Sequence, residues 1–236
     1  MAGSVVGEVA ALWRHPVKSL QGESLTDTEV GLHGLAGDRM YGVRDGLTGR
    51  VMSAKREPRL LEAAARYADG TVLVTLPGGE THAVEDPALD VCMTEWLGRP
   101  VVLLAATLAR PSGDPFMDAS PVHLVTDASL RTMAGQHPAG DWSQRRFRAN
   151  VFVEVDGSGL VEDGWVERAL AVGDVRLGVG ERTIRCVMTS AAQPGLPADP
   201  AILATTAELT GKYLGVYAEV LAAGRMSVGD EVVLLP

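Results

Sequence analysis

Basic and small polar side chains gather in short segments that also hold proline, glycine or other turn-forming residues. The set comprises Lys18-Ser19, Asp38-Arg39, Arg146, Arg148 with Asn150, and Arg185. Lysine offers a phosphate a point charge, arginine offers a planar fork of donors, and serine or asparagine can complete the hydrogen-bonding shell. Each residue taken singly is most simply an exposed surface charge. Taken together they suit a polyanionic ligand.

Cys186 is the residue whose chemistry the sequence leaves open. It lies in the apolar run from Thr183 to Met188, which we interpret as a strand, and it follows Arg185 directly. A neighbouring guanidinium can stabilise a thiolate, which would make this cysteine a metal ligand or a nucleophile. The composition of the run favours the alternative, a buried and inert core cysteine.

The remaining candidate metal ligands show no recognised pattern. The chain has two cysteines and five histidines, with no CxxC pair and no HxxxH arrangement. Neither a disulfide scaffold nor a structural zinc site is therefore expected. Cys92, close to Met93 and Trp96, is interpreted as a core residue.

Composition limits the class of partner. The 236 residues are 46% hydrophobic and 22% charged, with a formal net charge of −9. An acidic chain is not attracted in general to nucleic acid or to an anionic membrane, because both favour a basic surface. The longest apolar runs are short for a membrane span, and the N-terminus has no signal-peptide pattern. We expect a cytoplasmic protein that binds neither nucleic acid nor membrane.

The elements that must position these residues are mostly strands. Alternation and turn residues predict strands over 5–12, 23–30, 38–43, 71–76, 101–105, 122–125, 150–155, 183–188, 216–221 and 231–235. Helices are predicted from 86 to about 98, from 126 to beyond 133, and over 200–209, while 59–67 has helical propensity. Short strands between glycine-rich turns favour a mainly β, barrel-like architecture with a few covering helices. The segment from Ala109 to Phe116, rich in proline and small polar residues, is the predicted domain boundary.

Ordered motifs along nearly the whole chain resemble one known family. His15-Pro-Val-Lys-Ser-Leu-Gln-Gly22 is similar to a YPVKSxxG opening, and Gly37-Asp38-Arg39 and Arg56-Glu-Pro-Arg-Leu60 to the motifs that follow it. The second half repeats the rest of the pattern in order, with Asp118-Ala-Ser-Pro121, Ser129-Leu130, Arg146-Phe-Arg-Ala-Asn150, Glu162-Asp-Gly-Trp165, Gly173-Asp174, Arg185-Cys186, Gly224 and Val228-Gly-Asp230. By these motifs the chain resembles the MOSC family, named for the C-terminal domain of molybdenum-cofactor sulfurase.

The resemblance implies a fold and a set of site residues. It implies an α+β, mainly β fold, with a MOSC N-terminal β-barrel-like domain over 1–110 and a MOSC β-barrel domain over 111–236. It implies that Lys18, Ser19, Arg39 and Arg148 hold the phosphate and pterin of a molybdenum cofactor, lined by Asp118, Ser120, Asn150, Arg185 and Tyr217. It further implies that Cys186 is the catalytic protein ligand to molybdenum, in place of the core role that composition favours.

The resemblance also implies an activity. The likeness is to the branch that contains the mitochondrial amidoxime-reducing component and its bacterial counterparts, which bind molybdopterin and reduce N-hydroxylated compounds. The expected function is oxygen-atom removal from an N-oxygenated small molecule. Because the sequence stops after its last predicted strand, we expect no appended iron–sulfur domain and no membrane anchor. We therefore expect a separate electron-donor protein of flavin, ferredoxin or cytochrome type.

Two departures from the family pattern and two alternatives bear on this expectation. Ala149 replaces a common proline. The run after Cys186 lacks the usual TTxDPxTG pattern, and this second departure puts substrate preference in doubt.

One alternative is a sulfur carrier or transferase that uses a Cys186 persulfide. The other is a cofactor-free MOSC protein that binds a small ligand or a partner.

Overall fold

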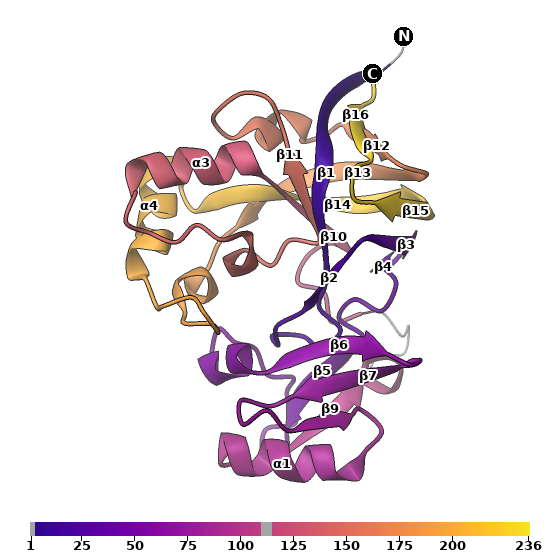
Figure 1. Cartoon of the computed structure of the whole chain (residues 1–236), viewed down its shortest axis with the longest axis vertical. Coiled ribbons are helices and arrows are strands. Elements are labelled where there is room, and N and C mark those ends of the chain that lie inside the picture. The colour runs from indigo at the N-terminus through magenta and orange to yellow at the C-terminus, as the bar shows by residue number, and fades with distance from the viewer. Residues whose placement is uncertain (1–2, 110–114) are drawn as a thin grey trace.

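Seven strands close a barrel in the computed structural model, which describes residues 3–109 and 115–236. They are β1 (Ser4–Arg14), β10 (Val122–Thr126), β11 (Val151–Glu154), β12 (Ala169–Val172), β13 (Val175–Ile184), β14 (Tyr213–Ala222) and β16 (Glu231–Leu234). Their order is β11-β10-β14-β13-β12-β16-β1, and β1 pairs back with β11 to close the ring. The barrel forms the upper body in Figure 1.

Alternation along the strands fills the barrel. In β13, Val175, Leu177 and Val179 are buried while Arg176 faces solvent, as the two-residue period of a strand requires. Strand β10 is buried at every position. It pairs in parallel with β11 and carries the helix α3 (Asp127–Gln136) after it, so both of its faces are covered.

Helices α3 and α4 (Pro200–Thr210) cover one side of the barrel (Figure 1). The Thr126 side chain accepts a hydrogen bond from the Ser129 amide and begins α3; Asp199 does the same for α4. Met133 of α3 and Ile202 of α4 share a buried cluster on this side. Three 3₁₀ turns complete the upper body, η2 (Gln144–Arg146), η3 (Val161–Trp165) and η4 (Val187–Ser190).

The lower body has its own core. Its elements are β5 (Tyr41–Asp45), η1 (Pro58–Glu62), β6 (Ala64–Ala68), β7 (Thr71–Thr75), β8 (Thr81–Ala83), α1 (Pro87–Leu97), β9 (Val101–Ala105) and α2 (Ala106–Ala109). Strand β5 pairs with β9, and β6, β7 and β8 form an antiparallel sheet. Asp86 caps the start of α1, and Gly98 ends it in the left-handed conformation. Helix α1 lies at the base of the molecule (Figure 1).

Short strands and pairings join the first and second halves of the chain. Strand β2 (Glu23–Leu25) pairs antiparallel with the end of β1, and β3 (Asp27–Gly31) pairs with both β4 (Gly34–Leu35) and β15 (Gly224–Ser227). Strand β1 itself lies between β11 and β16, and the start of β1 pairs with the end of β16 at the top of Figure 1. The barrel thus draws on both halves of the chain. The predicted boundary from Ala109 to Phe116 lies largely outside the described residues.

The mainly β, barrel-containing fold with covering helices is confirmed, and so are the helices at 87–97, 127–136 and 200–210. The predicted strand over 183–188 is wrong beyond Ile184, because the chain turns there into η4. Likewise the strand predicted over 38–43 begins only at Tyr41, and 59–67 divides into η1 and β6. Short apolar runs do not by themselves distinguish a strand from a tight turn.

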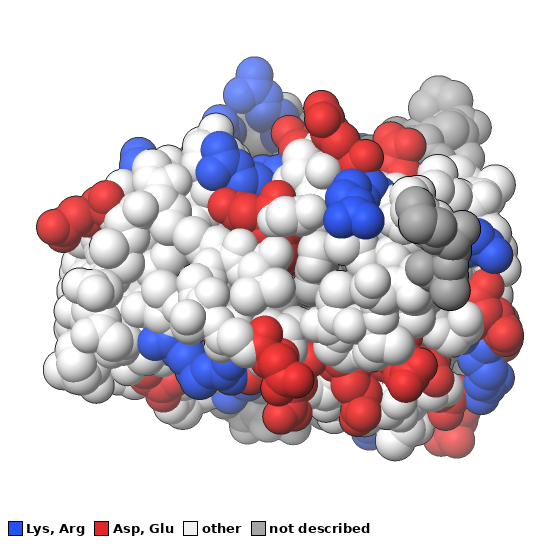
Figure 2. All heavy atoms as spheres, turned by 90° about the horizontal axis from the view of Figure 1, so that it is seen from above, with Lys and Arg blue, Asp and Glu red and all other residues white. Residues whose placement is uncertain are grey.

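Charged side chains on the upper end of the barrel are mixed in sign. In Figure 2, which views the molecule from above, acidic and basic residues are interspersed around a largely uncharged centre. In the described part of the chain, every helix is too short or too polar to cross a bilayer.

Candidate functional site

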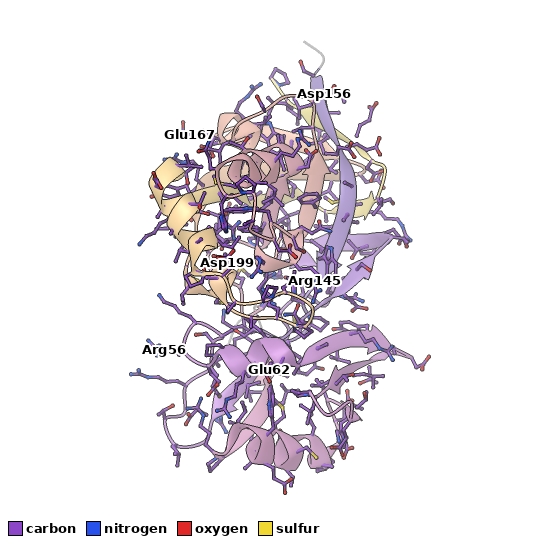
Figure 3. The ribbon with its side chains drawn as sticks, turned by 60° about the vertical axis from the view of Figure 1, so that its left-hand side comes forward. Arg56, Glu62, Arg145, Asp156, Glu167 and Asp199 are labelled. Carbon is purple, nitrogen blue, oxygen red and sulfur yellow. The ribbon has the colours of Figure 1, made fainter. Side chains whose placement is uncertain are left out.

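A cavity of about 100 Å³, open to solvent, is lined by most of the predicted site residues. Those lining it are Lys18, Ser19, Arg39, Asp118, Arg148, Arg185, Cys186 and Tyr217. Lys18 and Ser19 come from the connection between β1 and β2, and Arg39 from the turn before β5. Asp118 and Arg148 precede β10 and β11, Arg185 and Cys186 follow β13, and Tyr217 lies within β14. The cavity therefore lies where the two bodies meet. In Figure 3, Arg145 on the upper body and Glu62 on the lower body lie on either side of this junction.

Lys18 and Asp118 form an ion pair at the cavity. Nζ of Lys18 donates to Oδ1 of Asp118 at 2.6 Å and to the Phe116 carbonyl at 3.1 Å. Burial alone would raise the pKa of Asp118, but Lys18 and the nearby arginines outweigh it and lower the pKa. Asp118 therefore stays ionised and holds Lys18 at the cavity.

Three of the predicted ligand-binding residues have left-handed backbones. The φ angles are 72° at Ser19, 53° at Arg39 and 54° at Arg148. Non-glycine residues rarely adopt this conformation, which costs free energy and tends to persist where function requires it. The strained positions come from three separate segments, and all three line the same cavity.

Arg39 is held by partners from two segments. It forms an ion pair with Asp38, and its Nη1 lies 3.3 Å from Oδ1 of Asn150. Burial would lower the pKa of Arg39, but the Asp38 and Asp118 carboxylates raise it, so the guanidinium stays charged. Asn150 is buried behind the cavity wall and also binds the amide of His123 and the carbonyl of Trp13. Asn150 thus supports Arg39 without lining the cavity.

Arg148 is a half-buried cavity cation whose charge Asp38 and Asp118 offset only in part. Burial, with the nearby Arg39 cation, lowers the pKa of Arg148 to about 9. Its buried Nη1 has no hydrogen-bond partner in the described protein. Arg148 lines this cavity and an adjoining smaller hollow that also borders Trp13 and His15. A partly buried guanidinium in this state is stabilised by an anion, because an opposite charge offsets the loss of hydration.

In contrast, all three guanidinium nitrogens of Arg185 donate hydrogen bonds to protein groups. Nε donates to the Leu214 carbonyl at 2.7 Å, Nη1 to the Phe147 carbonyl at 3.1 Å, and Nη2 to the ring of His123. Burial lowers the pKa of Arg185 to about 10. Gly215, with a φ of +82°, leaves room here, since a Cβ at this position would lie 3.0 Å from Nη2 and 2.6 Å from the Leu124 carbonyl. Arg185 therefore braces the wall beside Cys186.

Cys186 lies at the cavity, half-buried and without a disulfide. Its carbonyl accepts hydrogen bonds from the amide and the hydroxyl of Thr189, which fold the chain back into η4. Tyr217 of β14 also lines the cavity, and burial raises the pKa of its phenol. The sulfur is thus neither in a continuous strand nor sealed in the core.

Arg146 anchors the segment that follows Cys186. Its guanidinium is buried and donates to four main-chain carbonyls, of Asp141, Thr189, Ala191 and Pro197. Arg146 therefore fixes the position of η4 and of the loop after it, although it also borders the cavity.

Several lining residues were not predicted as site residues. They are Ser53, His123, Phe147, Ile184, Met188 and Thr189. Arg146, which also lines the cavity, was in the basic set but was given no part in holding the cofactor. His123 is buried, and burial with the Arg185 charge holds its pKa well below the ordinary value. Because every position of β10 is buried, alternation along the strand does not distinguish His123 from its neighbours, and the sequence carries no signal for it. Ser120, which was predicted, is not among the lining residues.

The donor set fits a phosphorylated ligand that carries a thiophilic metal. Lys18, Arg39 and Arg148, with its unpartnered Nη1, supply positive charge, and Cys186 supplies a soft sulfur ligand at the same cavity. A cationic cavity that holds a single thiol does not suit a bare metal cation, because three cations repel it.

Comparisons with known proteins agree with these features. A family model described as the MOSC N-terminal beta barrel domain matches residues 6–95, and one described as the MOSC domain matches residues 113–233. Mitochondrial amidoxime-reducing component 1 of Mus musculus is 26% identical over 78% of this chain and 66% of its own length. Mitochondrial amidoxime reducing component 2 of Macaca fascicularis is 25% identical over 78% of this chain and 67% of its length. The matches thus span about two thirds of these relatives.

One solved structure matches over almost its full length. The YUAD protein from Bacillus subtilis superposes with a TM-score of 0.57, covering 99% of this chain and 98% of its own, at 12% identity. At this identity the likeness concerns the fold alone.

Proposed function

Because this chain belongs to the MOSC family, we propose that its cavity binds a molybdenum cofactor and that the protein is a reductase of N-oxygenated small molecules. The observation that carries the proposal is the buried Nη1 of Arg148, which has no hydrogen-bond partner in the described protein and lies at the cavity that Lys18 and Arg39 also line. A pterin phosphate would supply the missing negative charge. The names of the relatives, which refer to amidoxime reduction, support the reaction class.

Each cavity residue takes a distinct part in this proposal. Lys18, Ser19, Arg39 and Arg148 would bind the phosphate and the pterin, with Asp118 and Tyr217 beside them. Cys186 would provide the sulfur ligand to the metal. Asn150 and Arg185 would position other residues without touching the cofactor. Asn150 holds Arg39, and Arg185 fixes the chain next to Cys186. We assign Ser120 no contact.

The cofactor, when bound, supplies the two-electron chemistry that removes the oxygen atom of the substrate. In balance, an N-hydroxyl compound, two electrons and two protons give the N–H compound and water. The protein has to position the cofactor, leave an approach for substrate and exclude competing ligands. The electrons would come from a separate donor protein.

The approach to the site has an apolar side. Ile184 and Val187, on either side of Cys186, are 62% and 51% exposed. Ile184 also lines the cavity. Exposed aliphatic groups next to the reacting position favour substrates that carry an apolar group beside the N-hydroxyl. This region is also where the sequence departs from the family pattern.

Metal and pterin analysis tests the proposal. Full-length protein produced in a host that makes the cofactor should contain close to one molybdenum and one pterin per chain. It should reduce benzamidoxime with an artificial electron donor, and Cys186→Ser should abolish the reduction. A metal-free protein with cyanide-labile sulfur on Cys186 would instead establish a sulfur carrier, and a protein lacking both would establish a cofactor-free binding protein.

A further inference from the structure

A second group of metal-ligand side chains lies on the lower body, on elements other than those that form the cavity. Glu80 and His82 are two positions apart around the start of β8, and Cys92 lies on α1. Their ligand atoms all fall within 4.8 Å of one another. We propose that Glu80, His82 and Cys92 form a binding site for a divalent transition-metal ion, with Zn²⁺ as the best match.

The spacing of the ligand atoms fits a tetrahedral ion. Sγ of Cys92 lies 3.7 Å from Oε1 of Glu80, and Nε2 of His82 lies 2.9 Å from the same oxygen. Bonds to zinc of about 2.0–2.3 Å place neighbouring ligand atoms roughly 3.3–3.8 Å apart. Small side-chain rotations would therefore bring all three atoms onto one ion. Water would complete its coordination.

His82 is already oriented for this role. Its Nδ1 lies 2.9 Å from Oδ2 of Asp86, which leaves Nε2 facing Glu80. Nε2 is buried, and although Glu80 is close it makes no aligned hydrogen bond. A carboxylate on the second nitrogen of a metal-binding histidine fixes the ring and strengthens its basicity. Asp86 is itself held in place, because it also caps the first turn of α1.

The surrounding charge favours a cation. The carboxylates of Glu80, Asp86 and Glu95 lie near the thiol of Cys92, and burial together with these charges raises the pKa of that thiol. Asp86 and Glu80 likewise raise the pKa of His82. Three carboxylates around one thiol and one imidazole attract a positive ion to this position.

The donor types select the kind of ion. A thiolate, an imidazole and a carboxylate are the ligands of Zn²⁺ and related transition metals, whereas Ca²⁺ and Mg²⁺ prefer oxygen ligands alone. Such an ion would join β8, the edge strand of its sheet, to α1. Its role would be to stabilise the lower body. The sequence predicted no zinc site because the E-x-H-x9-C spacing matches no recognised motif.

Cobalt binding tests the site with Cys92 as the sole thiol. Full-length Cys186→Ser leaves only this cysteine, and Co²⁺ alone is titrated into it after chelator treatment. We expect one equivalent to bind, with a thiolate-to-cobalt charge-transfer band in the near ultraviolet that Zn²⁺ abolishes. Adding Cys92→Ser should remove the band. The absence of any such band in Cys186→Ser overturns the proposal.

Three further variants separate coordination from general attraction to acidic groups. His82→Gln should weaken Co²⁺ binding by at least tenfold, and Asp86→Asn, which keeps the helix cap, should weaken it by about 10- to 100-fold. Glu95→Gln removes a neighbouring charge but no ligand, so it should have a much smaller effect. Equal losses in Glu95→Gln and His82→Gln would show an acidic patch only and would overturn the site. Molybdenum content is a separate readout, which Cys92→Ser should leave unchanged in the wild-type background.

Discussion

Nη2 of Arg185 donates a hydrogen bond to Nε2 of His123, 62 positions earlier in the chain. Since Nε2 accepts this bond, the ring proton of a neutral His123 lies on Nδ1, and the ring also makes a hydrogen bond to the main chain of Arg148. The wall next to Cys186 and the turn that carries Arg148 are therefore connected through one uncharged histidine.

This arrangement predicts a loss of stability at mildly acidic pH. The pKa of His15 and of His123 is held well below its ordinary value, in each case by burial first and by neighbouring arginines second. Below about pH 6.5 the unfolded chain takes up protons at both histidines and the folded chain does not. Each histidine should therefore lower the unfolding free energy by about 1.4 kcal/mol per pH unit below that point. Urea denaturation at about pH 7 and about pH 5.5 measures it.

His123→Gln isolates the contribution of one histidine. The amide can accept from Arg185 and donate to the Arg148 main chain, so the variant should fold. Its unfolding free energy should depend less steeply on pH than that of the wild type, by the contribution of one proton over the same range. His82, whose pKa is raised, acts in the opposite direction but is the same in both proteins. Identical pH profiles for the two proteins would contradict the prediction.

Arg148→Ala should separate cofactor binding from stability. The variant loses a cation that the protein leaves with an unpartnered, buried Nη1, so it should retain little or no cofactor. Its cofactor-free form should be as stable as the wild type or more stable, by roughly 0.5–2 kcal/mol. Metal analysis and chemical denaturation measure the two effects. Arg168→Ala, at an exposed arginine bound to the Leu235 carbonyl, is the matched control and should retain full cofactor.

Arg146→Ala, unlike Arg148→Ala, should lower the stability of the fold, because the hydrogen bonds of this arginine all go to main-chain carbonyls of the protein. Bonds from a charged donor contribute about 1.5–3 kcal/mol each, and four carbonyls would lose theirs. We expect a loss of at least ~2 kcal/mol in unfolding free energy. The segment over 187–199 should also become sensitive to proteolysis. Wild-type stability in this variant would show that the bonds to η4 are dispensable.

A fragment covering residues 111–236 should not fold alone. Strand β1 pairs with both β11 and β16, so without it the barrel has two unpaired edges and loses Val9 and Leu12 from its core. The fragment should lack a cooperative thermal transition by circular dichroism. Co-expression with residues 1–110 should restore one. A cooperative transition in the isolated fragment would mean that β1 is not needed for closure.

The fold class and most elements could be predicted from the sequence, because they depend on local patterns. Caps and glycines mark α1, α3 and α4, and alternation marks β1 and β7. The exceptions are instructive. The run beginning at Thr183 resembles a strand, but hydrogen bonds of Thr189 to the Cys186 carbonyl end it at Ile184. Strand β12 was missed because its four residues carry no strong signal of their own.

The sequence by itself determined which residue types were present for an anion-binding site and, through the order of its motifs, which family they belong to. Only the tertiary structure decided which arginine is available. Arg146, Arg148 and Arg185 are the same residue type in the sequence. Arg146 and Arg185 donate hydrogen bonds to carbonyls of residues distant in the chain, whereas Nη1 of Arg148 has no partner in the described protein. The reason is physical: the state of a buried charge depends on partners brought close through space, and for Arg146 those partners lie up to 51 positions away.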